Sequence, residues 1–267
     1  MTSTLTHSVS HHSLLASFWQ GLHSRFLFKF VLPRLHHVRI HGVRLDVSSL
    51  SALMKNRLRT GRYEVEERRL ARRALTPSDV VLELGGAIGF MGLYCRKVIG
   101  VRHHVSVEAN PETVELLKRN YALNGLQPKV IQAAAAASDG QLEMDVAGEF
   151  WENTLLTAAG SGRKLTVPAL SLQRLVEAMP EAPTALICDI EGAEQFLDFK
   201  QLPESVKKII MELHPAVTGK AEVERILSDL RVMGFEQVGR EGDTRLLRRE
   251  TSKRTASPDP SRLCSGD

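Results

Sequence analysis

Acidic residues and glycines follow two apolar stretches of the chain at spacings that suit a nucleotide ligand. The first stretch, residues 80–82, is followed by an acid and three glycines: Glu83, Gly85, Gly86 and Gly89. The second, residues 101–107, ends at Glu108. Glycines let the backbone bend sharply and approach a ligand without a Cβ in the way, and an acid after the second strand suits ribose hydroxyls. The pattern predicts half of a nucleotide-binding βαβ unit.

The spacing of the glycines favours one class of nucleotide. A dinucleotide fingerprint G-x-G-x-x-G that starts at Gly85 would place Ala87 and Phe90 at its second and third glycines, and Phe90 is too large there. The pattern acid-x-G-x-G-x-G fits from Glu83 to Gly89 with one small substitution, at Ala87. We therefore predict an S-adenosylmethionine site, in which backbone amides of residues 85–89 approach the methionine portion. A nicotinamide-dependent oxidoreductase and a tight turn without a ligand are the alternatives.

A second group of acids follows a later apolar stretch, residues 184–188. Its members are Asp189, Glu191 and Glu194, and His214 follows the next stretch, residues 207–213. Ligands of doubly wound sheets sit at the carboxyl ends of the strands, so we expect Asp189 and Glu83 near the amino-acid end of the cofactor. Glu191, Glu194 and His214 are candidates for a general base, although His214 and Glu191 could equally make structural hydrogen bonds. The spacing predicts no metal ligands, and it leaves metal dependence open.

Two further residues complete the predicted cofactor contacts. Asn110 lies two residues after Glu108 and has the right type for the N-cap of a helix that begins with Pro111 and that Gly125 ends. Ala134 opens a run of small residues, 134–137, after a predicted strand at 129–133. Small residues at that edge either leave room for an adenine ring or simply pack tightly.

The remaining elements must position these residues. We predict helices over residues 50–75, 88–98, 171–179 and 220–233, with Ser171 as the N-cap of the third, and an antiparallel strand pair at 235–238 and 244–248. Residues 140–170 carry strand-like pieces, and Trp151, Glu152 and Asn153 are their most distinctive side chains. We expect this insertion or hairpin to grip a substrate.

The N-terminal region differs in character from the rest. Residues 14–32 are apolar and aromatic, but Gln20, Arg25 and Lys29 interrupt them, so no ordinary transmembrane span is predicted. The charged leader and cleavage site of a signal peptide are also missing. We expect an amphipathic helix that either packs on the domain or lies at a membrane interface. Residues 38–47 have the alternation of a hairpin.

Composition limits the function classes. Three scattered cysteines, Cys95, Cys188 and Cys264, fit neither a disulfide framework nor a zinc site, so a cytoplasmic location, with a peripheral membrane contact as an option, is expected. Residues 1–79 hold 13 Lys and Arg against 5 Asp and Glu, whereas the remainder holds 22 against 26. The basic character belongs to the N-terminal segment, which argues against a nucleic-acid partner for the catalytic face.

These motifs together resemble the FkbM family of S-adenosylmethionine-dependent methyltransferases. The resemblance rests on ELGGAIG (83–89), VEANPE (107–112), LLKRNYALNG (116–125), CDIEGAE (188–194) and IIMELH (209–214). It implies an α/β fold, the Rossmann-like class I methyltransferase sheet of seven mostly parallel strands with helices on both faces. It also implies methyl transfer to an oxygen of a sugar, polyketide or related metabolite, so that the partner is a small-molecule or glycan acceptor.

Two departures from the family pattern and one alternative accompany this resemblance. The family commonly has lysine where Cys188 stands and aspartate where Gln173 stands. A catalytically silent binding protein on the same scaffold, associated with a membrane through residues 14–32, is the competing hypothesis. The predicted organisation is an N-terminal extension (1–60), a methyltransferase-like domain (61–249) and a disordered tail (250–267).

Overall fold

The protein is built on a central seven-stranded sheet. The structure, a computed structural model, describes residues 26–146 and 163–249. The strands in order across the sheet are β11 (Phe235–Glu241), β12 (Thr244–Arg249), β10 (Lys208–Glu212), β9 (Ala185–Cys188), β3 (Val80–Leu84), β4 (His103–Glu108) and β5 (Lys129–Gln132). Strands β10, β9, β3, β4 and β5 are parallel, and β12 runs antiparallel to both of its neighbours. This is the predicted α/β sheet of seven mostly parallel strands.

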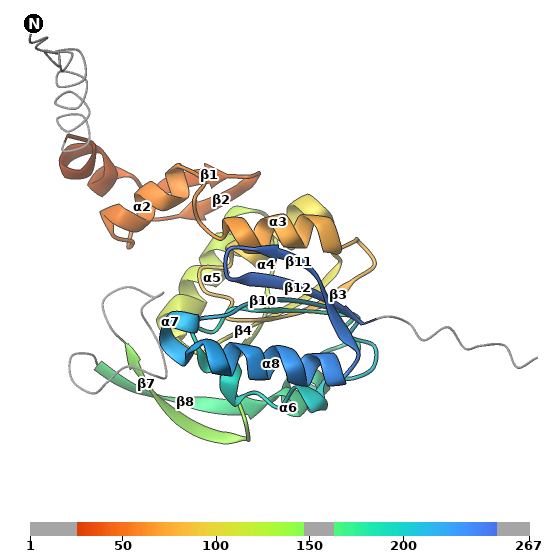
Figure 1. The fold of residues 1–267 in the computed structure, drawn as a ribbon. Coiled ribbons are helices and arrows are strands. Elements are labelled where there is room, and N and C mark those ends of the chain that lie inside the picture. Colours follow the sequence, from red (N-terminus) through yellow and green to blue (C-terminus); the bar gives the residue numbers. More distant parts are fainter. Residues whose placement is uncertain (1–25, 147–162, 250–267) are drawn as a thin grey trace, which may run out of the picture.

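Helices cover both faces of this sheet (Figure 1). One face packs against α3 (Val65–Ala74), α4 (Phe90–Tyr94) and α5 (Pro111–Leu123), and the other packs against α6 (Leu172–Glu177) and α8 (Lys220–Val232). Successive strand residues point to opposite faces, so Val81 belongs to the first core and Leu82 to the second. Strands that are buried on both sides are mostly apolar, which explains their hydrophobic runs; the buried polar exceptions in β3 and β4 are Glu83, His104 and Ser106.

Most predicted elements are present, and two predicted helices are irregular. The helix expected at 88–98 is α4 followed by a π-helical segment, Cys95–Ile99. The helix expected at 50–75 is wrong, because it is two helices, α2 (Ala52–Arg59) and α3. Gly61 and Glu64 adopt left-handed backbone conformations between them, with φ of 70° and 45°. A residue in this conformation ends a right-handed helix.

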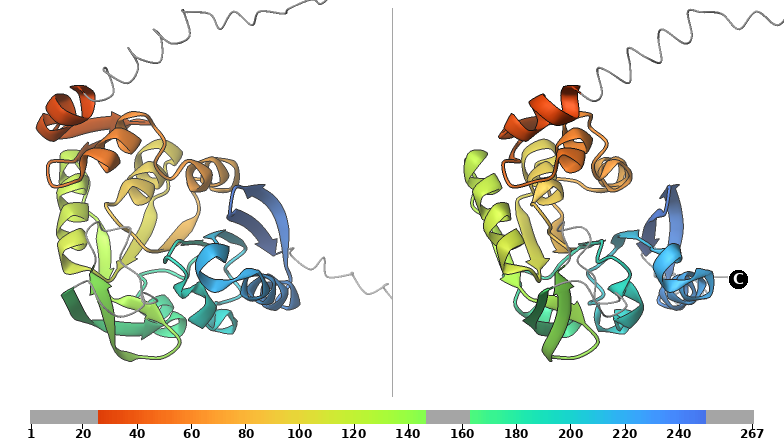
Figure 2. Two further views of the ribbon diagram at one scale, coloured as in Figure 1. Left: turned by 60° about the vertical axis from the view of Figure 1, so that its left-hand side comes forward. Right: turned by 90° about the vertical axis from the view of Figure 1, so that its left-hand side faces the viewer.

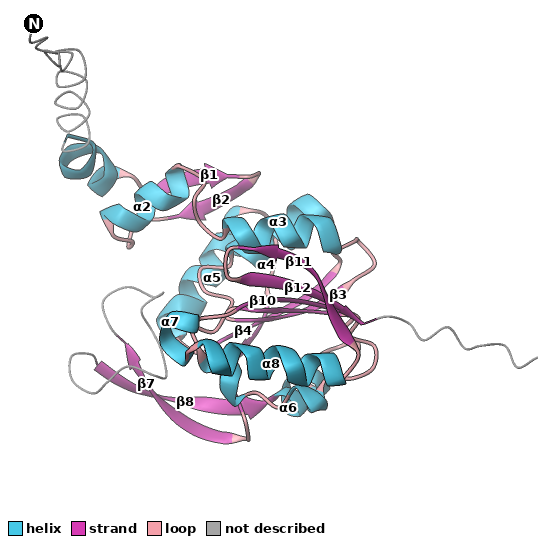
Figure 3. Ribbon diagram, in the orientation of Figure 1, coloured by secondary structure: helices cyan, strands magenta, loops and turns pink. Residues whose placement is uncertain are grey.

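A second, smaller sheet extends from the main body (Figures 1 and 3). Its strands are β6 (Ala134–Ala136), β8 (Arg163–Ser171) and β7 (Gly140–Val146), and β7 and β8 form an antiparallel pair. The strand-like pieces predicted at 140–170 are thus confirmed. Trp151, Glu152 and Asn153 lie outside the described residues.

The N-terminal part of the described chain forms a layer beside the sheet (Figure 2). The predicted hairpin is confirmed as β1 (His37–Ile40) and β2 (Val43–Asp46). Together with α2 it shares one hydrophobic core with α3 and α4, and Leu45 and Met54 contribute fully buried side chains. The predicted boundary at residue 60 therefore falls within a continuous core.

Only the end of the predicted amphipathic helix is described. Residues Leu27–Val31 are π-helical, Leu32–Arg34 form a 3-10 turn, and Phe26 and Phe30 are exposed. Across the described ranges, every helix is too short or too polar to cross a bilayer.

Candidate functional site

A cavity of about 390 Å³ opens at the carboxyl ends of the central strands. Six of the predicted residues line it: Gly85, Glu108, Ala134, Asp189, Glu191 and His214. It also has walls from α2, namely Met54 and Arg57, and from the region of α3, namely Tyr63, Glu64 and Glu67. The volume lies within the range of small-molecule sites, and the location is where a doubly wound sheet binds its ligands.

An added Cβ would meet different atoms at each of the three predicted glycines. A Cβ on Gly85 would lie 1.7 Å from the backbone oxygen of Asp189, so the turn after β3 presses directly on the end of β9. A Cβ on Gly86 would lie 2.9 Å from that of Ser106, and one on Gly89 would lie 2.9 Å from Leu117. Gly86 and Gly89 are not among the lining residues, because they serve the packing of the loop against β4 and α5.

The backbone amides of this loop are largely engaged within the protein. Gly85 and Gly86 both donate to the carbonyl of Val107, at 2.9 and 3.0 Å, and Gly89 donates to Gly86. Ala87 donates to the Glu108 carboxylate at 2.9 Å. The expectation that the amides of residues 85–89 face a ligand is thus wrong for these four. The amides of Gly85, Gly86 and Ala87 bind the end of β4, and that of Gly89 binds the loop itself.

Glu108 stands at the centre of this arrangement. One carboxylate oxygen accepts from Ala87 and the other from the amide of Asn110, at 2.9 Å each. Burial raises the pKa of Glu108, although these hydrogen bonds lower it. Each oxygen keeps lone pairs for further donors such as sugar hydroxyls. Asn110 is buried and is not among the lining residues; it caps α5 by accepting from Glu112.

Glu83 lies away from the cavity. Its side chain is buried beneath the glycine loop, where Oε2 accepts from the Ser106 hydroxyl at 2.6 Å and lies 3.4 Å from His104 Nε2. Burial raises the pKa of Glu83 to about 8, even though the Ser106 hydrogen bond lowers it. Burial also lowers the pKa of His104 to about 3. The sequence predicted that Glu83 and Asp189 both lie near the amino-acid end of the cofactor. In the structure only Asp189 lines the cavity.

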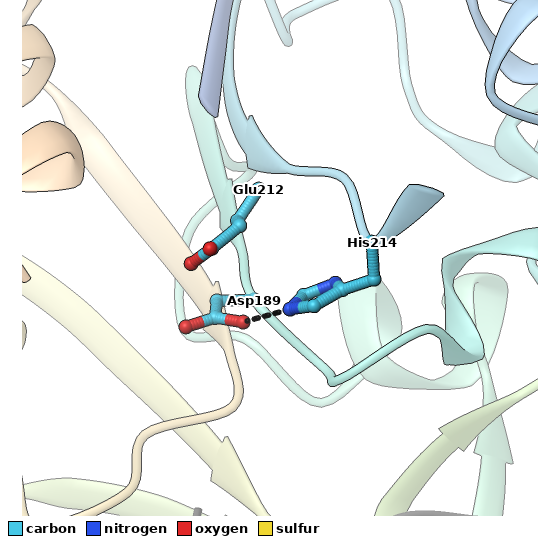
Figure 4. A group of neighbouring side chains, drawn as sticks. All are labelled: Asp189, Glu212 and His214. Carbon is cyan, nitrogen blue, oxygen red and sulfur yellow. Dashed lines mark ion pairs between the residues drawn. The ribbon is translucent and has the colours of Figure 1, made fainter. Parts of the chain in front are cut away.

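The acids after β9 converge on His214, which follows β10, and Figure 4 shows Asp189 beside the imidazole. Nε2 of His214 lies 3.6 Å from Asp189 Oδ1 and 3.4 Å from Glu191 Oε2, and Nδ1 lies 3.3 Å from Glu194 Oε1. Glu194 is only 1% exposed and also accepts from the amide of Ile190. The predicted general-base candidates therefore form one cluster, with Glu194 behind the imidazole and Asp189 and Glu191 in front.

Crowding of negative charge shifts the pKa values in this cluster. Burial first, and then repulsion from Glu212, raise the pKa of Asp189 well above its usual range. Burial and the neighbouring Glu67 raise that of Glu212 to about 7. Burial lowers the pKa of His214, but the Glu194 carboxylate, 3.3 Å from Nδ1, outweighs it, so that the pKa is raised. Strongly perturbed groups in a cavity are typical of functional sites.

Three lining residues hold uncommon backbone conformations. Glu64, Ala87 and Glu191 have φ of 45°, 43° and 53°, in the left-handed region that residues other than glycine seldom adopt. Such conformations persist where the surrounding structure imposes them, and they concentrate at functional sites.

Sequence reasoning missed several residues of the site. Glu212 ends β10 and could have been found by the rule that placed Asp189 and Glu108 at strand ends. Tyr63, Glu64 and Glu67 come from the α3 region, whose charged run reads as an ordinary solvated helix face. Glu67 is buried and accepts from the Thr244 hydroxyl. No local pattern shows that this helix closes the cavity.

Comparison with known proteins relates part of the chain to a methyltransferase. No protein-family model matches the chain, so the FkbM resemblance stays a prediction. Over 107 residues it is 29% identical to the protein-lysine N-methyltransferase EFM3 of Chaetomium thermophilum, a match that covers 38% of this chain and 32% of that protein. The matched segment thus spans about a third of the relative's length.

Two solved structures show a distant similarity of fold. The ribosomal protein L11 methylase of Lactobacillus delbrueckii subsp. bulgaricus is 13% identical, with a TM-score of 0.43 and coverage of 69% of this chain and 78% of that one. TYW2 of M. jannaschii, in complex with AdoMet, is 14% identical, with a TM-score of 0.42 and coverage of 79% and 82%.

Proposed function

We propose that the protein is an S-adenosylmethionine-dependent methyltransferase. The observation that carries this proposal is the joint position of Glu108 and the Asp189 cluster on one cavity at the carboxyl edge of the sheet. The match to part of a methyltransferase sequence supports it.

The residues present suit this cofactor. Glu108 has lone pairs left for the ribose hydroxyls, and Ala133, Ala134 and Ala135 line the cavity with small side chains that suit a flat ring. The cofactor carries a positively charged sulfonium and an ammonium group. The acidic lining, with Asp189 and Glu191 among it, would hold those charges. Bound there, the cofactor would supply an activated methyl group for in-line transfer.

The chain itself would contribute alignment and a proton acceptor. Most of the catalysis in such a displacement comes from holding the reacting atoms in line and excluding water. His214 Nε2 faces the cavity side of the cluster, while Glu194 lies against Nδ1. His214 would therefore take the proton from an acceptor hydroxyl through Nε2. Asp189 and Glu191 would stabilise the imidazolium that forms.

A hydroxyl of a small molecule or glycan is the acceptor we propose first. The His214 arrangement favours it, because a hydroxyl gains more from a general base than most other nucleophiles. An amine is the second candidate. The acidic lining favours a cationic group, and the relative that matches part of the chain is a protein-lysine N-methyltransferase.

Calorimetric titration of the full chain with S-adenosylmethionine, and separately with its demethylated product, tests the cofactor. We expect micromolar binding that falls at least tenfold in Glu108→Gln, because the NH2 group that replaces one carboxylate oxygen is a donor and cannot accept from a ribose hydroxyl. Glu112→Gln is the matched control, since Glu112 lies four residues away with its side chain 69% exposed. Absence of binding to the wild type contradicts the proposal.

Transfer of a labelled methyl group separates the acceptors. The assay would offer polyols and sugars in one set and lysine-containing peptides in the other. His214→Ala is expected to lower turnover on a hydroxyl by 10²-fold or more with cofactor affinity retained. Labelling confined to peptides would replace the hydroxyl proposal with the amine. Cofactor binding without transfer to either set would favour the silent scaffold.

A further inference from the structure

We propose that Asp189, Glu212 and His214 form a binding site for one divalent metal ion in the cavity. A nitrogen of His214 and a carboxylate oxygen of each acid all lie within 4.8 Å of one another. These are the donor types that Mn²⁺ and Zn²⁺ accept in proteins.

The three side chains come from neighbouring parallel strands and point toward a common space (Figure 4). Asp189 follows β9 directly, Glu212 ends β10, and His214 lies two residues beyond it. His214 Nε2 and Asp189 Oδ1 are 3.6 Å apart. Adjacent ligands of an octahedral ion lie about 3 Å from one another, so rotations of the side chains suffice to bring the donors together. The strand register holds their backbones in place.

The imidazole has a carboxylate beside its second nitrogen, within reach of the hydrogen bond that orients a metal-ligating histidine. The carboxylate of Glu194 lies 3.3 Å from Nδ1, and Glu194 is itself buried and held by the Ile190 amide. A ligating histidine characteristically donates its second N–H to a carboxylate, which leaves the other nitrogen for the metal. Here that other nitrogen, Nε2, faces Asp189. Asp189 Oδ1 is buried and has no hydrogen-bond partner within the described parts of the chain.

The charge of the surroundings also calls for a cation. Among the described residues, the acids that line the cavity are Glu64, Glu66, Glu67, Glu108, Asp189, Glu191 and Glu212. The lining cations other than His214 are Arg57 and Arg62. Carboxylates gathered away from water are costly unless they are paired or coordinate a metal. The cationic cofactor would offset part of this charge, and an ion at the three ligands would offset the part around β9 and β10.

The role of the ion rests on the proposed function. With the ion bound, His214 Nε2 would be a ligand and no longer the proton acceptor. The metal would hold an acceptor hydroxyl beside the cofactor site and would lower the pKa of that hydroxyl, and the Glu191 carboxylate on the same cavity would take its proton. Binding of the ion does not itself depend on methyl transfer, so the two proposals are tested separately.

Titration of the full chain with Mn²⁺, followed by the electron paramagnetic resonance signal of the free ion, tests the site. We expect one ion per chain, displaced by Zn²⁺, and at least tenfold weaker binding in Glu212→Gln, which keeps the size of the side chain and removes its charge. The matched control is Glu66→Gln, a lining acid outside the group of three, which should bind as the wild type does. Thermal unfolding checks that each variant is folded.

The outcomes separate the two proposals. Absence of Mn²⁺ binding, or equal binding by the wild type and Glu212→Gln, overturns the metal site, whatever the cofactor does. Ion binding that Glu212→Gln loses, in a chain that binds no S-adenosylmethionine with or without Mn²⁺, keeps the metal site and removes the methyltransferase proposal.

Discussion

At the scale of single residues, Glu83 shows how burial decides the state of an acid. Its carboxyl is 2% exposed and has Ser106 and His104 as polar neighbours. Burial disfavours the charged form and raises the pKa to about 8, and it lowers the pKa of His104 to about 3. Both groups are therefore neutral in the folded protein at neutral pH, and Glu83 supports the glycine loop from below.

This state predicts a pH-dependent stability. The pKa of Glu83 is raised on folding from about 4.5 to about 8, so its stabilising contribution is complete below pH 4.5 and is lost as the pH rises to 8. Glu83→Gln removes that titration. The variant should therefore gain stability relative to the wild type by about 1.4 kcal/mol per pH unit between pH 5 and 8. Urea unfolding at four pH values measures the difference.

The comparison isolates Glu83, because His104 contributes equally to both proteins unless the two groups are coupled. Glu115→Gln serves as the control: its carboxylate is 61% exposed, and its curve should run parallel to that of the wild type. If the stability of Glu83→Gln and that of the wild type changed with pH in parallel, Glu83 would be ionised in the folded protein.

At the scale of elements, the glycine loop and the end of β9 are fitted to each other. The backbone oxygen of Asp189 occupies the space that a Cβ on Gly85 would need, and Gly85 has a φ of +86°. Gly85→Ala must therefore displace the backbone of one element, at a cost of about 3 kcal/mol or more in the free energy of unfolding. Because Asp189 would move with it, cofactor binding should weaken as well.

Gly125→Ala provides the reference for this substitution. Gly125 ends α5 with a φ of +69°, and a Cβ there would meet nothing within 4 Å. Its cost should be only the backbone strain, about 1 kcal/mol. Chemical denaturation of both variants measures the two costs. Equal losses of stability in the two variants would mean that the backbone around Gly85 and Asp189 shifts at no cost to make room for the added methyl group.

The elements also show why part of the site was predictable. Parallel strands bring their carboxyl ends to one edge, so Glu108, Asp189 and His214 could be placed together from the order of apolar runs alone. Side-chain direction was not available from that pattern. Glu83 follows the same rule but points beneath the loop, and Tyr63 and Glu67 reach the cavity through a long-range packing of α3 that no local signal records.

At the scale of the whole molecule, the N-terminal layer and the sheet share one hydrophobic core. The hairpin β1–β2 and α2 share a core with α3, α4 and the strands, and Met54 and Arg57 line the cavity. The predicted boundary at residue 60 followed the extent of the family resemblance, which covers the chain from about there onward. A resemblance of motifs does not record packing, whereas the buried side chains on both sides of the boundary belong to one core.

The shared core predicts that the hairpin and the sheet unfold together. Leu45 is fully buried in β2, so Leu45→Ala should cost about 3 kcal/mol and lower the midpoint of thermal unfolding by on the order of 10 °C. The whole transition should move, seen both in the far-ultraviolet signal of the sheet and by calorimetry. Leu53→Ala is the control in the neighbouring helix: Leu53 is 57% exposed, and its loss should change stability by less than about 0.5 kcal/mol. If Leu45→Ala instead splits the unfolding into two steps and leaves the later midpoint unchanged, the N-terminal layer is a separate unit, because a residue in one cooperative core cannot weaken only part of it.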